Sequence, residues 1–138
     1  MVEPTDPSSE ATRLQSAMEL RRKVLGDAYV DGQAAPGDPV MQELQDYITQ
    51  TAWGVWDRGG ALSLRDRSLL VLAMTAAQGH IEEFVLHAGA QARTGVTDAE
   101  LDELLFHIAA YCGVPAGVAA KRALLALRAD RDREVRRT

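Results

Sequence analysis

The sequence predicts an all-α protein, a single-domain helical bundle of about six helices. Hydrophobic residues make up 46% of the 138 residues and aromatic residues only 5%, which favours a core of aliphatic side chains. These apolar residues recur at helical rather than strand spacing, across long stretches that lack glycine and proline. A chain of this length and apolar content can bury a core without disulfides or bound metals.

The N-terminal part of the chain is expected to hold two helices separated by a loop. Residues 11–25 repeat apolar side chains at spacings of four and seven and stop at Gly26, a residue type that commonly ends helices. The composition of residues 26–38 is that of a loop. Asp38 and Pro39 then form the pair expected at a helix start, a side-chain cap followed by proline.

The next two helices are expected to lie at the centre of the core. Ser63 can cap a helix over residues 64–78, whose apolar content predicts burial on nearly every side. Gly79 interrupts the pattern, and another helical stretch follows over residues 80–93 before it ends at Gly95.

Two further helices complete the predicted bundle. Thr97 and Glu100 form a capping box ahead of apolar residues spaced i, i+3, i+4 and i+7 that end at Cys112. The place of Cys112 in this apolar stripe predicts a small core residue rather than a nucleophile. Pro115 then begins an alanine-rich helix that extends to about Arg128 and whose small residues permit close approach to a neighbour.

Composition argues against several classes of function. With 15 Lys and Arg against 20 Asp and Glu, the net charge of −5 argues against a protein held on nucleic acid by phosphate neutralisation. The single cysteine excludes an intrachain disulfide and a Cys-x-x-Cys redox pair, and it suits a reducing compartment. The longest apolar run, residues 69–77, is far shorter than the about 20 residues of a membrane span. We therefore expect a cytoplasmic protein with no membrane or nucleic-acid partner.

Both ends of the chain are predicted to lie outside the folded domain. Residues 1–10 carry acidic and turn-forming residues where a secretory signal needs a basic start and an apolar core, so they are expected to form a short disordered lead-in. Arginines and acidic residues are interspersed over residues 129–138, which predicts a solvated, fraying tail. The domain itself is expected to span residues 11–128.

The clearest candidate for chemistry is a polar stripe on the helix predicted over residues 80–93. An α-helix turns about 100° per residue, so Glu83 lies about 60° and His87 about 20° from His80 around the helix axis. Two imidazoles and one carboxylate can therefore face one pocket. Glu82 points about 200° away, which predicts a solvent-exposed or salt-bridged side chain.

Three interpretations of this stripe are open on spacing alone. In the first, the carboxylate orients a histidine and raises its pKa, giving a set of general acid and base groups. In the second, the same two imidazoles and carboxylate bind a metal ion. In the third, the three are boundary residues whose polar atoms are satisfied by backbone and water.

Other polar and aromatic residues accompany this stripe. Trp53 and Trp56 are expected either in a core or interface or, because Gly54 lies between them and Arg58 follows, in the wall of a pocket. His107 shares a helix face with two glutamates opposite the apolar stripe and is predicted to lie at the surface. Local arginines would suit an anionic substrate in this acidic protein. Those nearest in sequence are Arg58, Arg65, Arg67 and Arg93.

Four ordered segments resemble the successive signature blocks of the carboxymuconolactone decarboxylase family. This resemblance implies an all-helical fold shared with the alkylhydroperoxidase-like superfamily and assembly into homo-oligomers, as trimers or hexamers. The redox branch of that superfamily carries a Cys-x-x-Cys pair and a histidine where this chain has His80, Glu83 and His87, so peroxidase activity is disfavoured. The segments are RRKVLGDAYVD (21–31), WGVWDRGGALSLRDRSLLVLAM (53–74), GHIEEFVLHAGAQARTGVT (79–97) and AAYCGVPAG (109–117).

The resemblance also implies a reaction, the decarboxylation of 4-carboxymuconolactone to 3-oxoadipate enol-lactone in aromatic catabolism. The lactone carbonyl of this small anionic substrate accepts the electrons left by CO₂, so no metal or organic cofactor is expected. His80 and His87 would stabilise the oxyanion and deliver a proton, in an order left open, and Glu83 would orient them. The residues implied to bind the substrate carboxylates or exclude water are Arg58, Arg67, Trp53 and Trp56.

Two departures from the family pattern leave alternatives open. The segment Gln91–Thr94 replaces an expected asparagine-rich segment, and the aromatic residue often found after Gly-Val-Pro-Ala is absent. A divergent or non-catalytic member that binds or acts on another lactone or β-keto-acid-like compound is therefore the alternative to the leading assignment.

Overall fold

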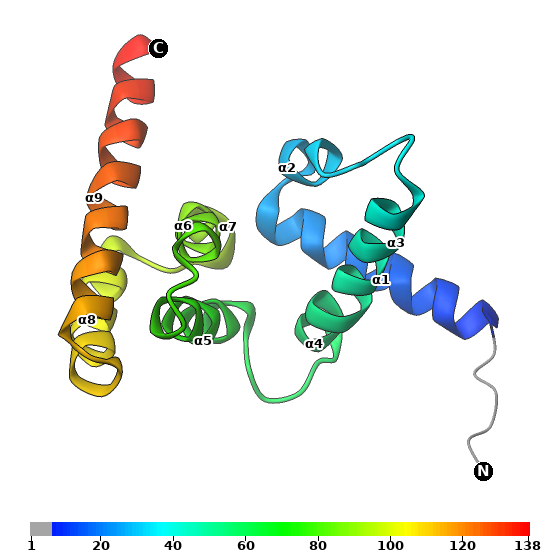
Figure 1. Ribbon diagram of the computed structural model, residues 1–138, viewed down its shortest axis with the longest axis horizontal. Helices are drawn as coiled ribbons and strands as arrows, with labels where there is room; N and C mark the ends of the chain where they lie inside the picture. Colours follow the sequence, from blue (N-terminus) through cyan, green and yellow to red (C-terminus); the bar gives the residue numbers. More distant parts are fainter. Residues whose placement is uncertain (1–6) are drawn as a thin grey trace. The chain divides into compact units, whose positions relative to one another are not determined.

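The computed structural model describes residues 7–138, and its regular elements are all helical, which confirms the predicted all-α class (Figure 1). Contacts within the chain divide it between Ala61 and Leu62 into two compact units, a division that the sequence did not predict. We call them the N-terminal unit and the C-terminal unit. None of the helices in the described range combines the length and apolar character needed to cross a bilayer.

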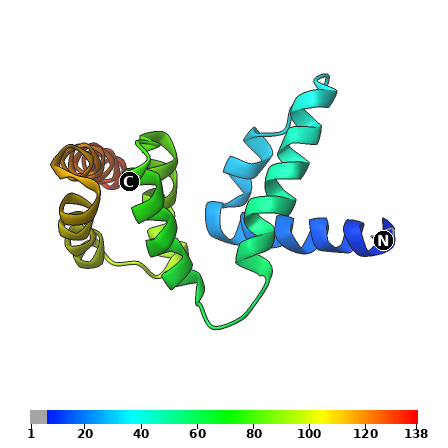
Figure 2. The ribbon, with the colours of Figure 1, turned by 60° about the horizontal axis from the view of Figure 1, so that its bottom comes forward.

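The N-terminal unit is built from a long first helix and a helical rod that crosses it (Figure 2). The rod consists of three successive elements, of which the middle one is a π-helical turn. It packs on the first helix through that turn and the element after it. The elements of this unit are α1 (Pro7–Leu25), α2 (Asp27–Gly32), α3 (Pro39–Ile48), the π-helical turn η1 (Thr49–Trp53) and α4 (Gly54–Asp57).

A buried arginine joins α1 to the rod. The guanidinium of Arg21 donates to Oγ1 of Thr49 at 3.1 Å and to Oε1 of Gln45 at 2.9 Å. The predicted cap at the start of α3 is confirmed, because the Asp38 carboxylate accepts a hydrogen bond from the backbone N–H of Met41 at 3.0 Å. The apolar core of this unit consists of Ala17, Val24, Leu25, Val30, Trp53 and Trp56.

The core of the C-terminal unit is formed by side chains from four of its helices. Both predicted caps are present: the Ser63 hydroxyl accepts from the N–H of Asp66, and Thr97 and Glu100 form the capping box. The elements are α5 (Leu64–Ala77), α6 (Ile81–Gly89), α7 (Gln91–Thr94), α8 (Asp98–Cys112) and α9 (Val114–Arg137). The core helices are α5, α6, α8 and α9, and their fully buried side chains include Leu72, Phe84, Leu101, Ile108 and Leu124.

Several predicted boundaries were wrong. The segment expected to be a loop contains α2, and α1 begins at Pro7 within the expected disordered lead-in, of which residues 1–6 lie outside the described range. The charged tail is helical as far as Arg137, although its side chains are exposed as expected. The helix expected over residues 80–93 is divided into α6 and α7 by Ala90.

Two predictions of burial were also wrong. The helix α5, expected to be buried on nearly every side, exposes 43% of Leu70 and 56% of Met74. Cys112, expected in the core, is exposed because α8 ends there, beyond the part of the helix that packs. Apolar sequence alone predicts what a helix can bury, whereas the neighbouring helices decide what it does bury.

The helices α8 and α9 approach each other closely at a glycine, as the small residues of the last predicted helix permit. A Cβ atom at Gly117 would lie 2.8 Å from the Ala109 Cβ and 3.1 Å from its Cα. Charged side chains add to this contact further along, where Arg128 donates to Asp102 at 2.8 Å and Arg131 to Asp98 at 3.0 Å.

We predict that Gly117→Ala lowers the free energy of unfolding by about 1–2 kcal/mol. The added methyl group meets the backbone of Ala109, and this clash exceeds the about 1 kcal/mol of helix propensity that alanine gains over glycine. Thermal and urea unfolding of the purified protein would measure the change. Gly89→Ala is the matched control, since its Cβ would meet only Leu127 Cδ1 at 3.9 Å. Equal stability of the two variants would contradict the prediction.

Candidate active site

The stripe of two histidines and a glutamate lies at the start of α6. Gly79 adopts a positive φ of 75° that few other residues accept, and this turn lets the chain reverse after α5. His80 follows as the residue that precedes the first helical turn, with its N–H donating to the Thr75 carbonyl at 2.9 Å. The Phe84 N–H in turn donates to the His80 carbonyl at 3.0 Å, which starts the helix.

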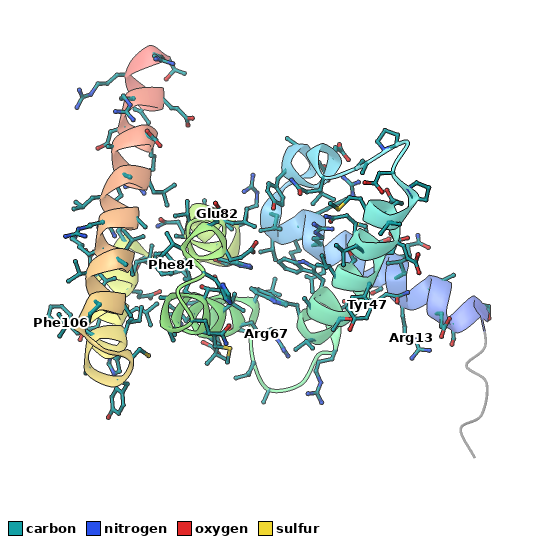
Figure 3. All side chains as sticks on the ribbon, viewed as in Figure 1. Arg13, Tyr47, Arg67, Glu82, Phe84 and Phe106 are labelled. Atoms are coloured by element: carbon teal, nitrogen blue, oxygen red, sulfur yellow. The ribbon has the colours of Figure 1, made fainter. Side chains whose placement is uncertain are left out.

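The three residues of the stripe lie at different depths. His80 and Glu83 are exposed, whereas His87 is only 6% exposed. Phe84 and Ala88 are fully buried, so the stripe lies beside the face of α6 that contacts the core. In Figure 3 the side chain of Phe84 points toward α9. The stripe therefore begins with exposed polar side chains and ends with a buried imidazole.

Burial changes the protonation of the inner histidine. Desolvation disfavours the charged imidazolium and lowers the pKa of His87 from 6.5 to about 4. His87 is therefore a neutral imidazole at neutral pH, with one nitrogen able to donate a hydrogen bond and the other able to accept one. Such a group can stabilise a developing negative charge by donation without first carrying a positive charge.

The neighbouring glutamate behaves as its angular position predicts. Glu82 is exposed and lies on the other side of α6 from the core-facing residues, which confirms the expectation of a solvent-facing side chain (Figure 3). His107, on α8, is exposed as predicted. These two residues provide internal comparisons for the stripe, because each shares a residue type with it and differs in position.

The candidate substrate-binding arginines differ in environment. Arg67, on α5 of the C-terminal unit, is buried, and its Nε donates to the Leu62 carbonyl at 3.2 Å. Arg58 follows α4 in the N-terminal unit and is exposed. Arg65, another cation near the stripe in sequence, forms an ion pair with Glu100, with 2.5 Å between Nη2 and Oε1. Arg67 thus lies in the same unit as the stripe, and Arg58 in the other.

The two tryptophans form an aromatic pair inside the N-terminal unit. The ring centroids of Trp53 and Trp56 lie 5.0 Å apart with the planes tilted by 33°. Both side chains are buried, in agreement with the core alternative held open for them. The π-helical turn η1 ends at Trp53 and places it beside α1, a local geometry that no spacing rule in the sequence predicted.

The metal interpretation of the stripe gains no support from the geometry. Within residues 7–138, no three His, Cys, Asp or Glu side chains gather closely enough to hold a metal ion. His80, Glu83 and His87 share a face but are separated by depth, so they do not converge on one point as ligands must.

Ser68 is a buried polar residue near the stripe's helix that the sequence pattern did not single out. Ser68 on α5 is fully buried, and its hydroxyl has no hydrogen-bond partner within the described chain. It shares the inward side of α5 with Leu72 and Ala76, on a helix that packs against α6. Its position directly before the apolar run of residues 69–77 was the feature of the sequence that could have indicated a buried hydroxyl.

Comparison with known proteins decides the family. The model of the carboxymuconolactone decarboxylase family matches residues 42–126, a segment that contains the stripe, both candidate arginines and both tryptophans. The chain belongs to the carboxymuconolactone decarboxylase family. It is 36% identical over 113 residues to the 4-carboxymuconolactone decarboxylase of Acinetobacter baylyi, covering 81% of this chain and 84% of the relative.

A second relative has a different substrate in its name. The chain is 36% identical over 121 residues to the nitrosuccinic acid decarboxylase of Metarhizium robertsii, covering 82% of this chain and 84% of the relative. The family and both of these relatives are named for decarboxylation, which supports decarboxylase activity in this carboxymuconolactone decarboxylase family member.

We predict that His87 makes folding stability depend on pH between about 4 and about 6.5. The unfolded chain binds a proton at His87 in this range and the folded chain does not, so stability is lost as the pH falls from about 6.5 to about 4. The shift corresponds to about 3 kcal/mol. The measurement compares urea unfolding of the wild type and His87→Gln across this range.

The free energy of unfolding of the wild type minus that of His87→Gln is expected to grow as the pH rises from 4 to 6.5 and to stay constant above 6.5. His107→Gln, which alters an exposed histidine, serves as the control and should give a profile parallel to that of the wild type. Parallel profiles for the wild type and His87→Gln would contradict the assignment. Titration of the His87 ring by NMR measures the same pKa directly.

Proposed function

We propose that this chain is a cofactor-independent carboxy-lyase that converts 4-carboxymuconolactone to 3-oxoadipate enol-lactone in aromatic catabolism. The observation that carries the proposal is the His80–Glu83–His87 stripe, in which one histidine is buried and neutral and the other two groups are exposed. The family membership supplies the reaction class, and the stripe supplies the groups that this class requires.

The proposed chemistry uses the substrate as its own electron acceptor. When the bond to the carboxylate breaks, CO₂ leaves and its electron pair moves through the ring alkene to the lactone carbonyl oxygen. The resulting enolate needs a hydrogen-bond donor at that oxygen and then a proton at the α-carbon. No external electron sink is required, which is why we propose that no metal or organic cofactor takes part.

The different depths of the two histidines support different roles. A neutral, desolvated imidazole donates to the enolate oxygen in a medium where such a bond is strong, so we assign oxyanion stabilisation to His87. His80 is exposed and can recover a proton from water after each turnover, so we assign proton delivery to the α-carbon to His80. Glu83, one turn from both, orients His80.

The two relatives support a substrate class wider than one lactone. Nitrosuccinic acid and 4-carboxymuconolactone both carry a carboxylate on a carbon from which electrons can pass to an oxygen-bearing acceptor, a nitro group or a lactone carbonyl. Both also carry a second carboxylate that is not lost. A dicarboxylic acid with its own electron sink is therefore the proposed class, and a nitro acid is the second candidate substrate.

The remaining candidate residues are proposed to hold the substrate. Arg67 and Arg58 pair with its carboxylates, because guanidinium groups bind carboxylates through two parallel hydrogen bonds. Trp53 and Trp56 help to exclude water. The alternative, a divergent or non-catalytic member that binds another lactone or β-keto-acid-like compound, predicts binding without release of CO₂.

We also propose a cytoplasmic homo-oligomer, a trimer or hexamer, with the alkylhydroperoxidase-like arrangement of helices. The support is the exposed apolar side of α5, where Leu70 and Met74 lie one helical turn apart and remain uncovered by the rest of the described chain. Contiguous apolar surface of this kind marks an interface.

We predict that His80→Ala, Glu83→Gln and His87→Ala each lower kcat for 4-carboxymuconolactone by about a hundredfold or more. Each change removes a group that acts on the reacting atoms or orients one that does. Turnover is followed by ultraviolet absorbance and by released CO₂. Glu82→Gln is the matched control, because it alters the adjacent residue of the same helix on the opposite side.

The same assay tests the alternatives. Wild-type turnover in all three stripe variants would contradict the catalytic assignment, and the absence of turnover with both the lactone and nitrosuccinate would contradict the proposed substrate class. We expect protein treated with a chelator to keep its full activity, since the lactone carbonyl takes up the electrons. Loss of activity on chelation, restored by a metal ion, would contradict the cofactor-independent mechanism.

We predict that Leu70→Lys combined with Met74→Lys converts the oligomer to monomers. Two charges on this apolar side of α5 would have to be desolvated at the interface, which opposes assembly. Size-exclusion chromatography with light scattering measures the mass. Glu103→Lys, at an exposed charged position on α8, should leave the assembly intact. An oligomer that is unaffected by the double substitution, or a wild-type monomer, would contradict this interface.

A further inference from the structure

The N-terminal unit contains a hollow of about 660 Å³ whose lining includes Arg58 but none of the three residues of the stripe. It is formed by the first turns of α1, the π-helical turn η1, the short helix α4 and the residue that follows it. We call it the α1–α4 hollow. The residues that decide its character are Arg13, Gln50, Thr51, Gly54, Asp57 and Arg58.

Two arginines that line this hollow have guanidinium nitrogens available to bind an anion. Within residues 7–138 the structure gives Arg58 no ion pair or hydrogen bond, and its side chain is exposed. Arg13 is oriented by Ser9, with Nε donating to the Ser9 carbonyl at 3.2 Å and Nη2 to its hydroxyl at 3.1 Å. Its Nη1 group is not used in these bonds. One guanidinium is therefore positioned, and the other can turn to meet a ligand.

The lining also holds two acidic residues, Asp57 and Glu10, which balance the formal charges of the two arginines. Asp57 accepts a hydrogen bond from the Ser16 hydroxyl at 2.6 Å, which holds α4 against α1 and stabilises the carboxylate where it is. Glu10 also lies in the lining, where its carboxylate repels a bound anion. An anion held by two guanidinium groups in this setting is bound reversibly, and Glu10 limits its affinity.

The backbone of the rod keeps the hollow open. Gln50 and Thr51 belong to η1, and π-helical turns are rare features that occur frequently at functional sites. Gly54 has an ordinary helical conformation, and a Cβ atom placed on it would meet nothing within 4 Å. Space next to Gly54 is therefore available to a ligand, with the neutral polar groups of Gln50 and Thr51 beside it.

We propose that the α1–α4 hollow binds a small organic carboxylate. Arg58 and Arg13 hold the carboxylate group through charge-assisted hydrogen bonds, and Gln50 and Thr51 bond to the remaining polar atoms of the ligand. Arg13 belongs to α1, which lies outside the segment matched by the family model. The carboxylate belongs either to the substrate, which rests on the proposed function, or to a separate small acid.

The test uses the full chain and an unreactive ligand, so that it does not depend on turnover. The two tryptophans of the protein, Trp53 and Trp56, are next in sequence to lining residues of the hollow. Both belong to the N-terminal unit, so tryptophan fluorescence reports on this unit alone. Succinate is titrated at low ionic strength, with its uncharged diamide as the comparison and calorimetry as a second measurement. We expect saturable binding of succinate that weakens with salt, and no binding of the diamide.

Variants locate the binding. Arg58→Ala and Arg13→Ala should each weaken succinate binding about tenfold, because each removes charge-assisted hydrogen bonds. Glu10→Gln should tighten binding about threefold by removing a like charge. Gly54→Leu should abolish binding by filling the hollow, and Gly54→Ala is its milder companion if the larger residue affects folding. Lys23→Ala, another exposed cation of α1 outside the lining, should leave binding unchanged.

The outcomes separate this proposal from the proposed function. Binding that is absent, equal for succinate and its diamide, or insensitive to Arg13, Arg58 and Gly54 would overturn the hollow as a carboxylate site, whether or not the enzyme is active. A higher KM with unchanged kcat in Arg13→Ala identifies the substrate as the source of the carboxylate. Unchanged KM together with succinate binding identifies a separate acid. Succinate binding in a chain without decarboxylase activity would support the hollow and contradict only the proposed function.

Discussion

The packing that buries the imidazole of His87 is the constraint on which the candidate active site depends. Desolvation of this ring holds its pKa near 4 and keeps it neutral, while His80, two turns earlier, remains in solvent. This segment therefore presents two imidazoles in different environments, one exposed and one buried. The turn at Gly79 places the start of α6 at the surface. The later turns of the helix pack on the core through Phe84 and Ala88, and His87 is buried there with them.

The parts of the fold that depend on neighbouring residues in sequence were predictable. The caps at Asp38, Ser63 and Thr97 join atoms three residues apart, so the residue types alone indicate them, and the structure confirms all three. Burial depends on residues that are distant in sequence. The exposure of Met74 and Cys112 could not be predicted, because an apolar residue at helical spacing is equally compatible with a core and with an uncovered face.

The same distinction applies to the site. Helical periodicity places His80, Glu83 and His87 on one stripe and Glu82 opposite, but it carries no information about depth along that stripe. Depth lowers the pKa of His87, and it is set by the way α6 packs on α5 and α9. The π-helical turn η1 departs from regular α-helical periodicity, so neither the hollow beside it nor the place of Arg13 in its lining could be inferred from spacing.

Substrate chemistry explains why relatives with this framework carry different substrate names. A substrate that contains its own electron sink requires from the protein only a hydrogen-bond donor and a proton. These two requirements are the same for an enolate and for the nitronate formed from a nitro acid. The reacting residues can therefore stay constant while the substrate changes. Discrimination must then come from groups that hold the carboxylate that is not lost. In this chain the residues proposed for this role are two arginines in contrasting settings, the buried Arg67 and the exposed Arg58.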